Sequence, residues 1–171
     1  MSAPRRSTKA VFRLILIKPS HYDDDGYVIQ WVRSSIPSNT LAALYGLALD
    51  AARRQVLGQD VEIRLHAYDE TNTRIKVKRL VRLIRSSSAG GMVALVGVQS
   101  NQYPRAMDLA RRLRAEKIQV CIGGFHVSGC LSMLPAMPQD LQEAVELGVS
   151  LFAGELDGRM DELLLDAFRR E

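Results

Sequence analysis

The stretch "MVALVGVQSNQYPRA", residues 92–106, places the most uniformly apolar run of the chain directly before a polar turn and the start of a helix. A strand that is buried on one face alternates apolar and polar residues, whereas a strand buried on both faces is apolar throughout. Strands of the second kind are typical of parallel sheets covered by helices on both sides. Residues 92–98 are therefore predicted to form a central strand of an α/β domain.

The rest of the chain repeats the same alternation of strand and helix. Runs with strand character cover residues 11–20, 61–67, 119–124 and 150–154. Apolar residues at helical spacing predict helices around residues 41–52, 77–84, 106–113 and 160–167, and a weaker helix at 141–147. Because right-handed crossovers connect parallel strands, we expect a flavodoxin-like, doubly wound, five-stranded parallel sheet in the order 2-1-3-4-5, with helices on both faces.

Length and composition favour a single domain. The chain has 171 residues, of which 47% are hydrophobic and 25% charged, as is typical of a globular protein. We expect a basic tail at residues 1–10 and one α/β domain at residues 11–171. No apolar run approaches the roughly 20 residues of a membrane helix, and no signal peptide is expected. Two cysteines, Cys121 and Cys130, are too few for a disulfide framework, so the sequence predicts free thiols and a cytoplasmic protein.

The segment "RIKVKRLVRLIR", residues 74–85, carries six cations and no acid. We interpret it as a helix that covers the sheet and turns a basic face outward, either to solvent or to an acidic partner domain. A phosphate backbone or an anionic membrane surface would be alternative partners. Nucleic acid is not favoured as a partner, since neither interleaved aromatic residues nor a known binding motif accompanies the charges.

The connection between the first strand and its helix is unusually long. About twenty residues, "SHYDDDGYVIQWVRSSIPSN" (20–39), stand where two to six are usual. We expect this loop to pack against the domain, because it contains several aromatic residues, including Trp31. Its aspartates, Asp23 to Asp25, are interpreted as a solvated acidic turn rather than a metal site. Ser38 or Asn39 is expected to cap the following helix.

A ligand of an open parallel sheet binds beyond the carboxyl ends of the strands, where the strand order reverses. Small, polar or bare-backbone residues follow all five predicted strands. They are Ser20, His21, Tyr68, Asp69, Gln99, Ser100, Asn101, Gln102, Gly123, Gly124, Phe125, His126, Gly154 and Glu155. Neither GxGxxG nor GxxxxGK[ST] follows the first strand, which argues against a dinucleotide or P-loop nucleotide site.

Two segments, residues 93–129 and 141–167, point to a family. Their "CIGGFHVSG" and "FAGELDG" elements, with the polar turn "QSNQ", resemble the cobalamin-binding domain that precedes the barrel of cobalamin-dependent radical SAM enzymes. The resemblance implies a corrinoid on the carboxyl edge of the sheet, bordered by Ser20 and the long loop. It implies hydrogen bonds from residues 100–102 to the ring's amides or the nucleotide arm. Gly123 and Gly124 would leave room for that arm.

One departure concerns the cobalt ligand. Corrinoid carriers use an Asp-x-His-x-x-Gly motif, but here Pro19 stands at the Asp position and four residues separate His21 from Gly26. The lower ligand of cobalt is left open, and no protein ligand to a metal is assigned. We expect His21 to form a rim hydrogen bond or to be exposed. His126 either contacts the ligand or forms a structural hydrogen bond.

A second departure is the lack of a CxxxCxxC motif. The iron–sulfur cluster and S-adenosylmethionine would therefore belong to a separate radical SAM barrel domain or subunit, and the chain is not expected to be catalytic alone. The alternative is a corrin-free domain that keeps the fold for protein docking. A third interpretation is a small hydrolase or transferase that uses His21, His126 and the aspartates. It is disfavoured because no nucleophile stands beside a base at a recognisable spacing.

Overall fold

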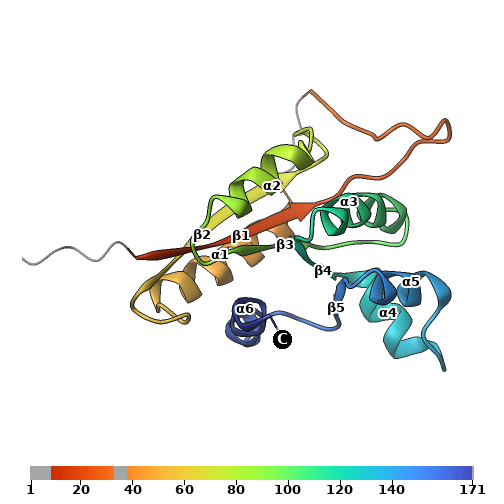
Figure 1. Ribbon diagram of the computed structural model, residues 1–171. Helices are drawn as coiled ribbons and strands as arrows, with labels where there is room; N and C mark the ends of the chain where they lie inside the picture. The colour runs from red at the N-terminus through yellow and green to blue at the C-terminus, as the bar shows by residue number, and fades with distance from the viewer. Residues whose placement is uncertain (1–8, 33–37, 171) are drawn as a thin grey trace, which may run out of the picture.

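The computed structural model describes residues 9–32 and 38–170, which form an α/β domain around a five-stranded parallel sheet (Figure 1). The sheet order is β2-β1-β3-β4-β5, so the predicted flavodoxin-like order 2-1-3-4-5 is confirmed. The strands are β1 (Ala10–Lys18), β2 (Val61–Asp69), β3 (Gly91–Leu95), β4 (Gln119–Gly123) and β5 (Ser150–Phe152). The helices are α1 (Asn39–Arg53), α2 (Val77–Arg85), α3 (Tyr103–Ala115), α4 (Phe125–Met133), α5 (Gln139–Glu146) and α6 (Met160–Arg169).

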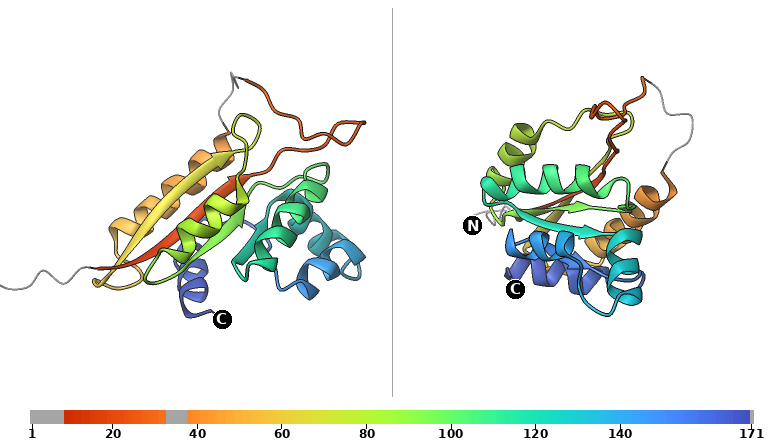
Figure 2. Two further views of the ribbon diagram at one scale, coloured as in Figure 1. Left: turned by 45° about the horizontal axis from the view of Figure 1, so that its top comes forward. Right: turned by 90° about the vertical axis from the view of Figure 1, so that its right-hand side faces the viewer.

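The two faces of the sheet bury alternate residues of β1, as the period of two requires. Leu14 and Leu16 belong to a core cluster with residues of α1 and α6. Ile15 and Ile17 belong to a second cluster with residues of α2, α3 and α5. The helices therefore form one layer on each side of the sheet, and β1 lies between β2 and β3 (Figure 2).

Helix α2 has the amphipathic form that the sequence predicts. Its apolar residues Val77, Leu80, Val81 and Ile84 are all buried against the sheet. Its lysine and arginine side chains are exposed, and Arg85 pairs with Glu116 across 2.7 Å. This arrangement agrees with a sheet-covering helix that has a basic outer face.

Helix α4 was not predicted. Its apolar residues Val127, Cys130 and Leu131 have helical spacing, but Val127 is its one buried residue. The helix continues past the end of β4 instead of running back along the sheet, and α5 then returns toward β5 (Figure 1). With so short an apolar face, the periodic signal of this helix in the sequence is weak.

The long loop after β1 is held by hydrogen bonds at its base. The Ser20 hydroxyl donates to the Ile29 carbonyl across 2.5 Å, and the Trp31 amide donates to the Thr71 carbonyl across 2.7 Å. Residues 33–37 lie outside the described residues. The Ser38 hydroxyl accepts from the Leu41 amide at 3.2 Å, which confirms Ser38 as the cap of α1. Within residues 9–32 and 38–170, no helix is both long and apolar enough to cross a membrane.

Candidate functional site at the carboxyl edge

The carboxyl edge of the sheet is the side on which β1, β3 and β4 end, at the right of Figure 1. The chain runs from β1 outward to β2 and then crosses back to β3, so the strand order reverses between β1 and β3. Ser20 follows β1 at this point and Gln99 follows β3. Ligands of open α/β sheets bind at this kind of reversal.

A buried ion pair fixes the loop after β1 to the sheet and to α3. Glu70 is fully buried, and its carboxylate accepts hydrogen bonds from the Arg105 guanidinium, the shortest at 2.6 Å. The same carboxylate accepts from the backbone amide of Ser20 at 3.1 Å. Ser20 is itself fully buried, so it supports the loop from below and is not exposed to a ligand at the rim.

Tyr22 extends this network to the surface of α3. Its hydroxyl donates to Asp108 across 2.5 Å and accepts from Arg105 at 3.2 Å. Burial raises the pKa of Tyr22, and the hydrogen bond to Asp108 raises it further. His21, the neighbouring predicted residue, is half-buried, and its carbonyl accepts from the Ile29 amide at 2.9 Å.

The turn after β3 divides the predicted polar residues into two groups. The Gln102 side chain is buried and accepts from the Gln99 amide at 3.0 Å, so it stabilises the turn. Gln99, Ser100 and Asn101 are exposed. Amide and hydroxyl groups are therefore available at the edge from three consecutive residues.

The paired glycines are explained by close packing within the chain. Gly124 has a φ of +139°, and a Cβ atom there would lie 2.2 Å from the backbone nitrogen of Val98. A Cβ atom on Gly123 would lie 3.4 Å from Phe152. The space beside both glycines is thus occupied by neighbouring strand ends. A ligand at this edge would therefore contact exposed side chains of the strand ends, and it would not occupy the space beside Gly123 and Gly124.

His126 lies at the centre of a polar cluster formed by three separate segments. Its Nδ1 atom is 3.1 Å from the Ser100 hydroxyl, and its Nε2 atom is 2.9 Å from a carboxylate oxygen of Asp140. The imidazole stacks on Tyr103 with ring centroids 4.2 Å apart. The Cys130 sulfur lies 4.0 Å from Nε2. Both ring nitrogens of His126 are therefore engaged within the chain.

Tyr103 supports this cluster from beneath. Its hydroxyl donates to the backbone carbonyl of Asp140 at 3.0 Å, which joins the start of α3 to the start of α5. Burial raises the pKa of Tyr103, and the negative charge of Asp140 raises it further, so the phenol keeps its proton. The position of Asp140 relative to His126 is thus fixed by α3 as well as by α5.

The end of β5 is tied to α4. The Gly154 amide donates to the Ser128 hydroxyl at 3.0 Å, and Glu155 beside it is exposed. Arg159 stacks over the Phe152 ring at 4.6 Å and donates to the Ala153 carbonyl. This part of the edge is therefore built by contacts within the chain, and the Glu155 side chain is exposed beside it.

Exposed apolar side chains lie on two separate segments at this end of the sheet, the loop after β1 and the region of α4 (Figure 1). Of the ten exposed large hydrophobic residues within 9–32 and 38–170, eight belong to the loop after β1, to α4 or to its connection to α5. We call these eight the apolar rim. They are Tyr27, Trp31, Val32, Phe125, Leu131, Met133, Leu134 and Met137. Their exposure is high, with Tyr27 at 72%, Phe125 at 71% and Met133 at 79%. Exposed apolar side chains in groups are typical of surfaces that a ligand or partner covers.

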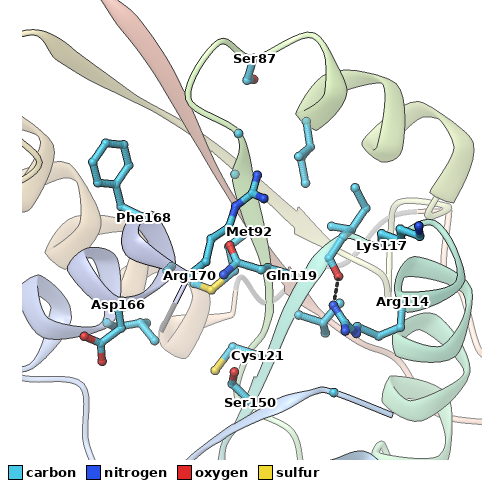
Figure 3. A pocket seen from close by; sticks show the side chains of 18 of the residues that line it. Ser87, Met92, Arg114, Lys117, Gln119, Cys121, Ser150, Asp166, Phe168 and Arg170 are labelled. Atoms are coloured by element: carbon cyan, nitrogen blue, oxygen red, sulfur yellow. Dashed lines mark hydrogen bonds between the residues drawn. The ribbon is translucent and has the colours of Figure 1, made fainter.

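A recess of about 1240 Å³ opens at the opposite, amino edge, beside α6 and the starts of β3 and β4 (Figure 3). Two of its cations have structural roles. Arg114 donates to the carbonyls of Leu147 and Ile118, and Arg85 pairs with Glu116. Burial raises the pKa of the Cys121 thiol at its floor to about 12. None of the predicted site residues lines this recess, so it is separate from the carboxyl edge.

Among the described residues, no group of three or more histidine, cysteine, aspartate or glutamate side chains is arranged to hold a metal ion. In the comparisons with known proteins, no protein-family model matches the chain, and no curated protein matches it significantly. The site must therefore be interpreted from its own geometry.

Sequence reasoning missed the residues that complete these networks. Asp140 contacts His126 from a different helix, and Arg105 contacts Glu70 across 35 positions. Cys130 follows His126 by one helical turn, but α4 itself was not predicted. Asp140 in the first turn of α5 is explained by the helix dipole alone, so its position in the sequence does not signal a contact with His126.

Proposed function

We propose that this chain is a cobalamin-binding module that holds a corrinoid at the carboxyl edge for a radical SAM barrel on another domain or subunit. The observation that carries the proposal is the apolar rim beside the exposed polar residues Gln99, Ser100 and Asn101. A corrin ring has a broad apolar face and a periphery of amide side chains. Aromatic side chains such as Trp31 and Phe125 would contact the face, and the polar turn would bond the amides.

The chain's own part in this function is to bind and orient. The Glu70–Arg105 pair keeps the loop with Trp31 and Tyr27 at the edge, since Ser20 is anchored to the same carboxylate. When bound, a corrinoid supplies alkyl-transfer chemistry at cobalt. Both ring nitrogens of His126 already have partners, so no residue of the edge is assigned as a cobalt ligand. A cytoplasmic location fits the free thiols of this module.

The experiment mixes the purified chain with hydroxocobalamin, removes free corrinoid by gel filtration and measures the visible absorbance that stays with the protein. Phe125→Ala is expected to weaken binding about 10- to 100-fold, because burying a phenylalanine contributes roughly 1.5–3 kcal/mol. Tyr45→Ala is the matched control, since Tyr45 is an exposed aromatic residue on α1 and lies outside the apolar rim. Failure of the unaltered chain to retain any corrinoid would refute the proposal.

One observation favours a second candidate, a corrin-free domain that docks a partner protein through the same edge. The backbone of Val98 fills the space beside Gly124, where the nucleotide arm of cobalamin was expected. In that case the apolar rim would be covered by protein. A stable complex with a radical SAM barrel, formed without corrinoid and lost on Phe125→Ala, would support this candidate over the first.

A further inference from the structure

The Ser100, His126 and Asp140 side chains form a connected hydroxyl, imidazole and carboxylate at the carboxyl edge. From this geometry we propose that Ser100 is a nucleophile for acyl transfer from carboxylic esters, with His126 as its general base and Asp140 as the group that orients the base. This inference concerns an activity of the chain itself and does not depend on corrinoid binding.

The two hydrogen bonds of His126 define one neutral tautomer. Asp140 is 2.9 Å from Nε2, and an ionised carboxylate can only accept, so the imidazole proton belongs on Nε2. The lone pair of Nδ1 then faces the Ser100 hydroxyl at 3.1 Å and can take its proton. A base within this distance of a hydroxyl, oriented in turn by a carboxylate, is the arrangement that activates serine in unrelated enzymes.

The base is held rigidly, which is what proton transfer at a fixed geometry needs. The His126 side chain is 13% exposed and stacks on Tyr103. The second oxygen of Asp140 accepts from the Leu141 amide at 2.8 Å, so its carboxylate is anchored at the first turn of α5. Ser100, in contrast, is exposed, and a substrate can reach it.

Donors for the developing oxyanion lie on the same turn as the nucleophile. The backbone amides of Ser100 and Asn101 donate to no acceptor within the described residues, although the adjacent amides of Gln99 and Gln102 do. Serine hydrolases place the amide of the residue after the nucleophile against the oxyanion. In this proposal, the amides of Ser100 and Asn101 would bind the oxyanion that forms when the Ser100 hydroxyl attacks.

The surroundings favour an ester with an apolar acyl group. Phe125 precedes His126 at the start of α4 and is 71% exposed, and the apolar rim continues along α4. Cys130 is not assigned as the nucleophile. Its sulfur lies 4.0 Å from Nε2, and that nitrogen directs its proton to Asp140, so it has no lone pair for the thiol.

In the acylation step, the Ser100 oxygen bonds to the ester carbonyl carbon while its proton passes to Nδ1 of His126. The bond from that carbon to the leaving alkoxide then breaks, and the proton moves from Nδ1 to the alkoxide. The acyl group stays on Ser100 and a neutral alcohol departs. Attack by water repeats the same transfers, releasing the carboxylic acid and restoring the hydroxyl.

The test uses corrinoid-free protein, a fluorophosphonate probe that labels activated serines, and p-nitrophenyl butyrate as substrate. We expect stoichiometric labelling that peptide mass spectrometry maps to Ser100, and release of nitrophenolate. Ser100→Ala should abolish both. His126→Gln and Asp140→Asn should each slow labelling by about 100-fold or more. Ser132→Ala is the matched control, because Ser132 lies on α4 and its hydroxyl contacts only carbonyls of its own helix.

Circular dichroism of each variant shows whether it folds, so that lost labelling is assigned to the site. Cys130→Ala is included because p-nitrophenyl esters also acylate thiols, and a nitrophenolate release that falls to background in this variant would assign the ester reaction to the thiol instead of Ser100. Absence of label at Ser100 in the folded protein, or equal labelling of the wild type and His126→Gln, would overturn the inference. Neither result bears on hydroxocobalamin retention, so the two proposals can fail separately.

Discussion

Removal of the Arg105 guanidinium should severely destabilise the domain. In the structure, Arg105 reaches the Glu70 carboxylate at 2.6, 3.1 and 3.2 Å. After Arg105→Met, the Ser20 amide at 3.1 Å is the one donor that remains, among the described residues, to a carboxylate with 0% exposure. Breaking a buried ion pair by removing one partner costs about 3–5 kcal/mol. That is a large share of the roughly 5–15 kcal/mol by which a folded domain is stable.

Urea unfolding followed by far-ultraviolet circular dichroism measures the loss. The double variant Arg105→Met with Glu70→Met should recover most of it, because neither charge is then left unpaired. Arg54→Met is the control, since Arg54 forms exposed ion pairs with Asp50 and Asp161 and its removal should scarcely move the midpoint. If Arg105→Met cost less than about 1 kcal/mol, the anchoring role of the pair would be refuted.

Three further predictions follow from single positions. Gly124→Ala should destabilise the domain by about 3 kcal/mol or more in urea unfolding. The reason is that φ at this position is +139° and the added methyl group meets the backbone of Val98. An unchanged free energy of unfolding would contradict the packing described. A disulfide reagent should modify Cys130 in the folded protein much faster than Cys121, whose pKa is raised to about 12 by burial; equal rates would contradict this. Burial lowers the pKa of His66 in the folded domain, and the positive charges of Arg13, Arg79 and Arg64 lower it further. The unfolded chain therefore binds a proton at His66 more readily than the folded domain. The free energy of unfolding should fall as pH drops below about 6.5, the ordinary pKa of histidine. His66→Gln should reduce that fall in urea midpoints measured from pH 7.5 to 5; an unchanged slope would contradict it.

The fold could be predicted because its signals are local. Leu14 and Leu16 face one helical layer and Ile15 and Ile17 the other, so residues 14–17 of β1 are apolar without a break. Helix α4, which the sequence did not predict, has nine residues and Val127 as its one buried residue, so its periodic pattern is short and weak. Element order follows from such patterns, whereas a short helix at the edge is set by contacts far along the chain.

The candidate site could be predicted only in part. The sequence places Ser100 and His126 at one edge, because each follows a strand of the same parallel sheet. It gives no sign that Asp140 reaches the imidazole, since that contact depends on α5 returning to the starts of α3 and α4. Likewise, the burial of Ser20 depends on its bond to Glu70, which no spacing along the chain indicates.

The central claim, that the apolar rim binds a corrinoid, is tested most directly by the fluorescence of Trp31. Trp31 is the single tryptophan of the chain and belongs to the rim with 65% of its surface exposed. Titration with hydroxocobalamin, corrected for absorption with free N-acetyltryptophanamide, should quench this fluorescence saturably at one corrinoid per chain. Quenching no greater than that of the free indole at every concentration would contradict the account.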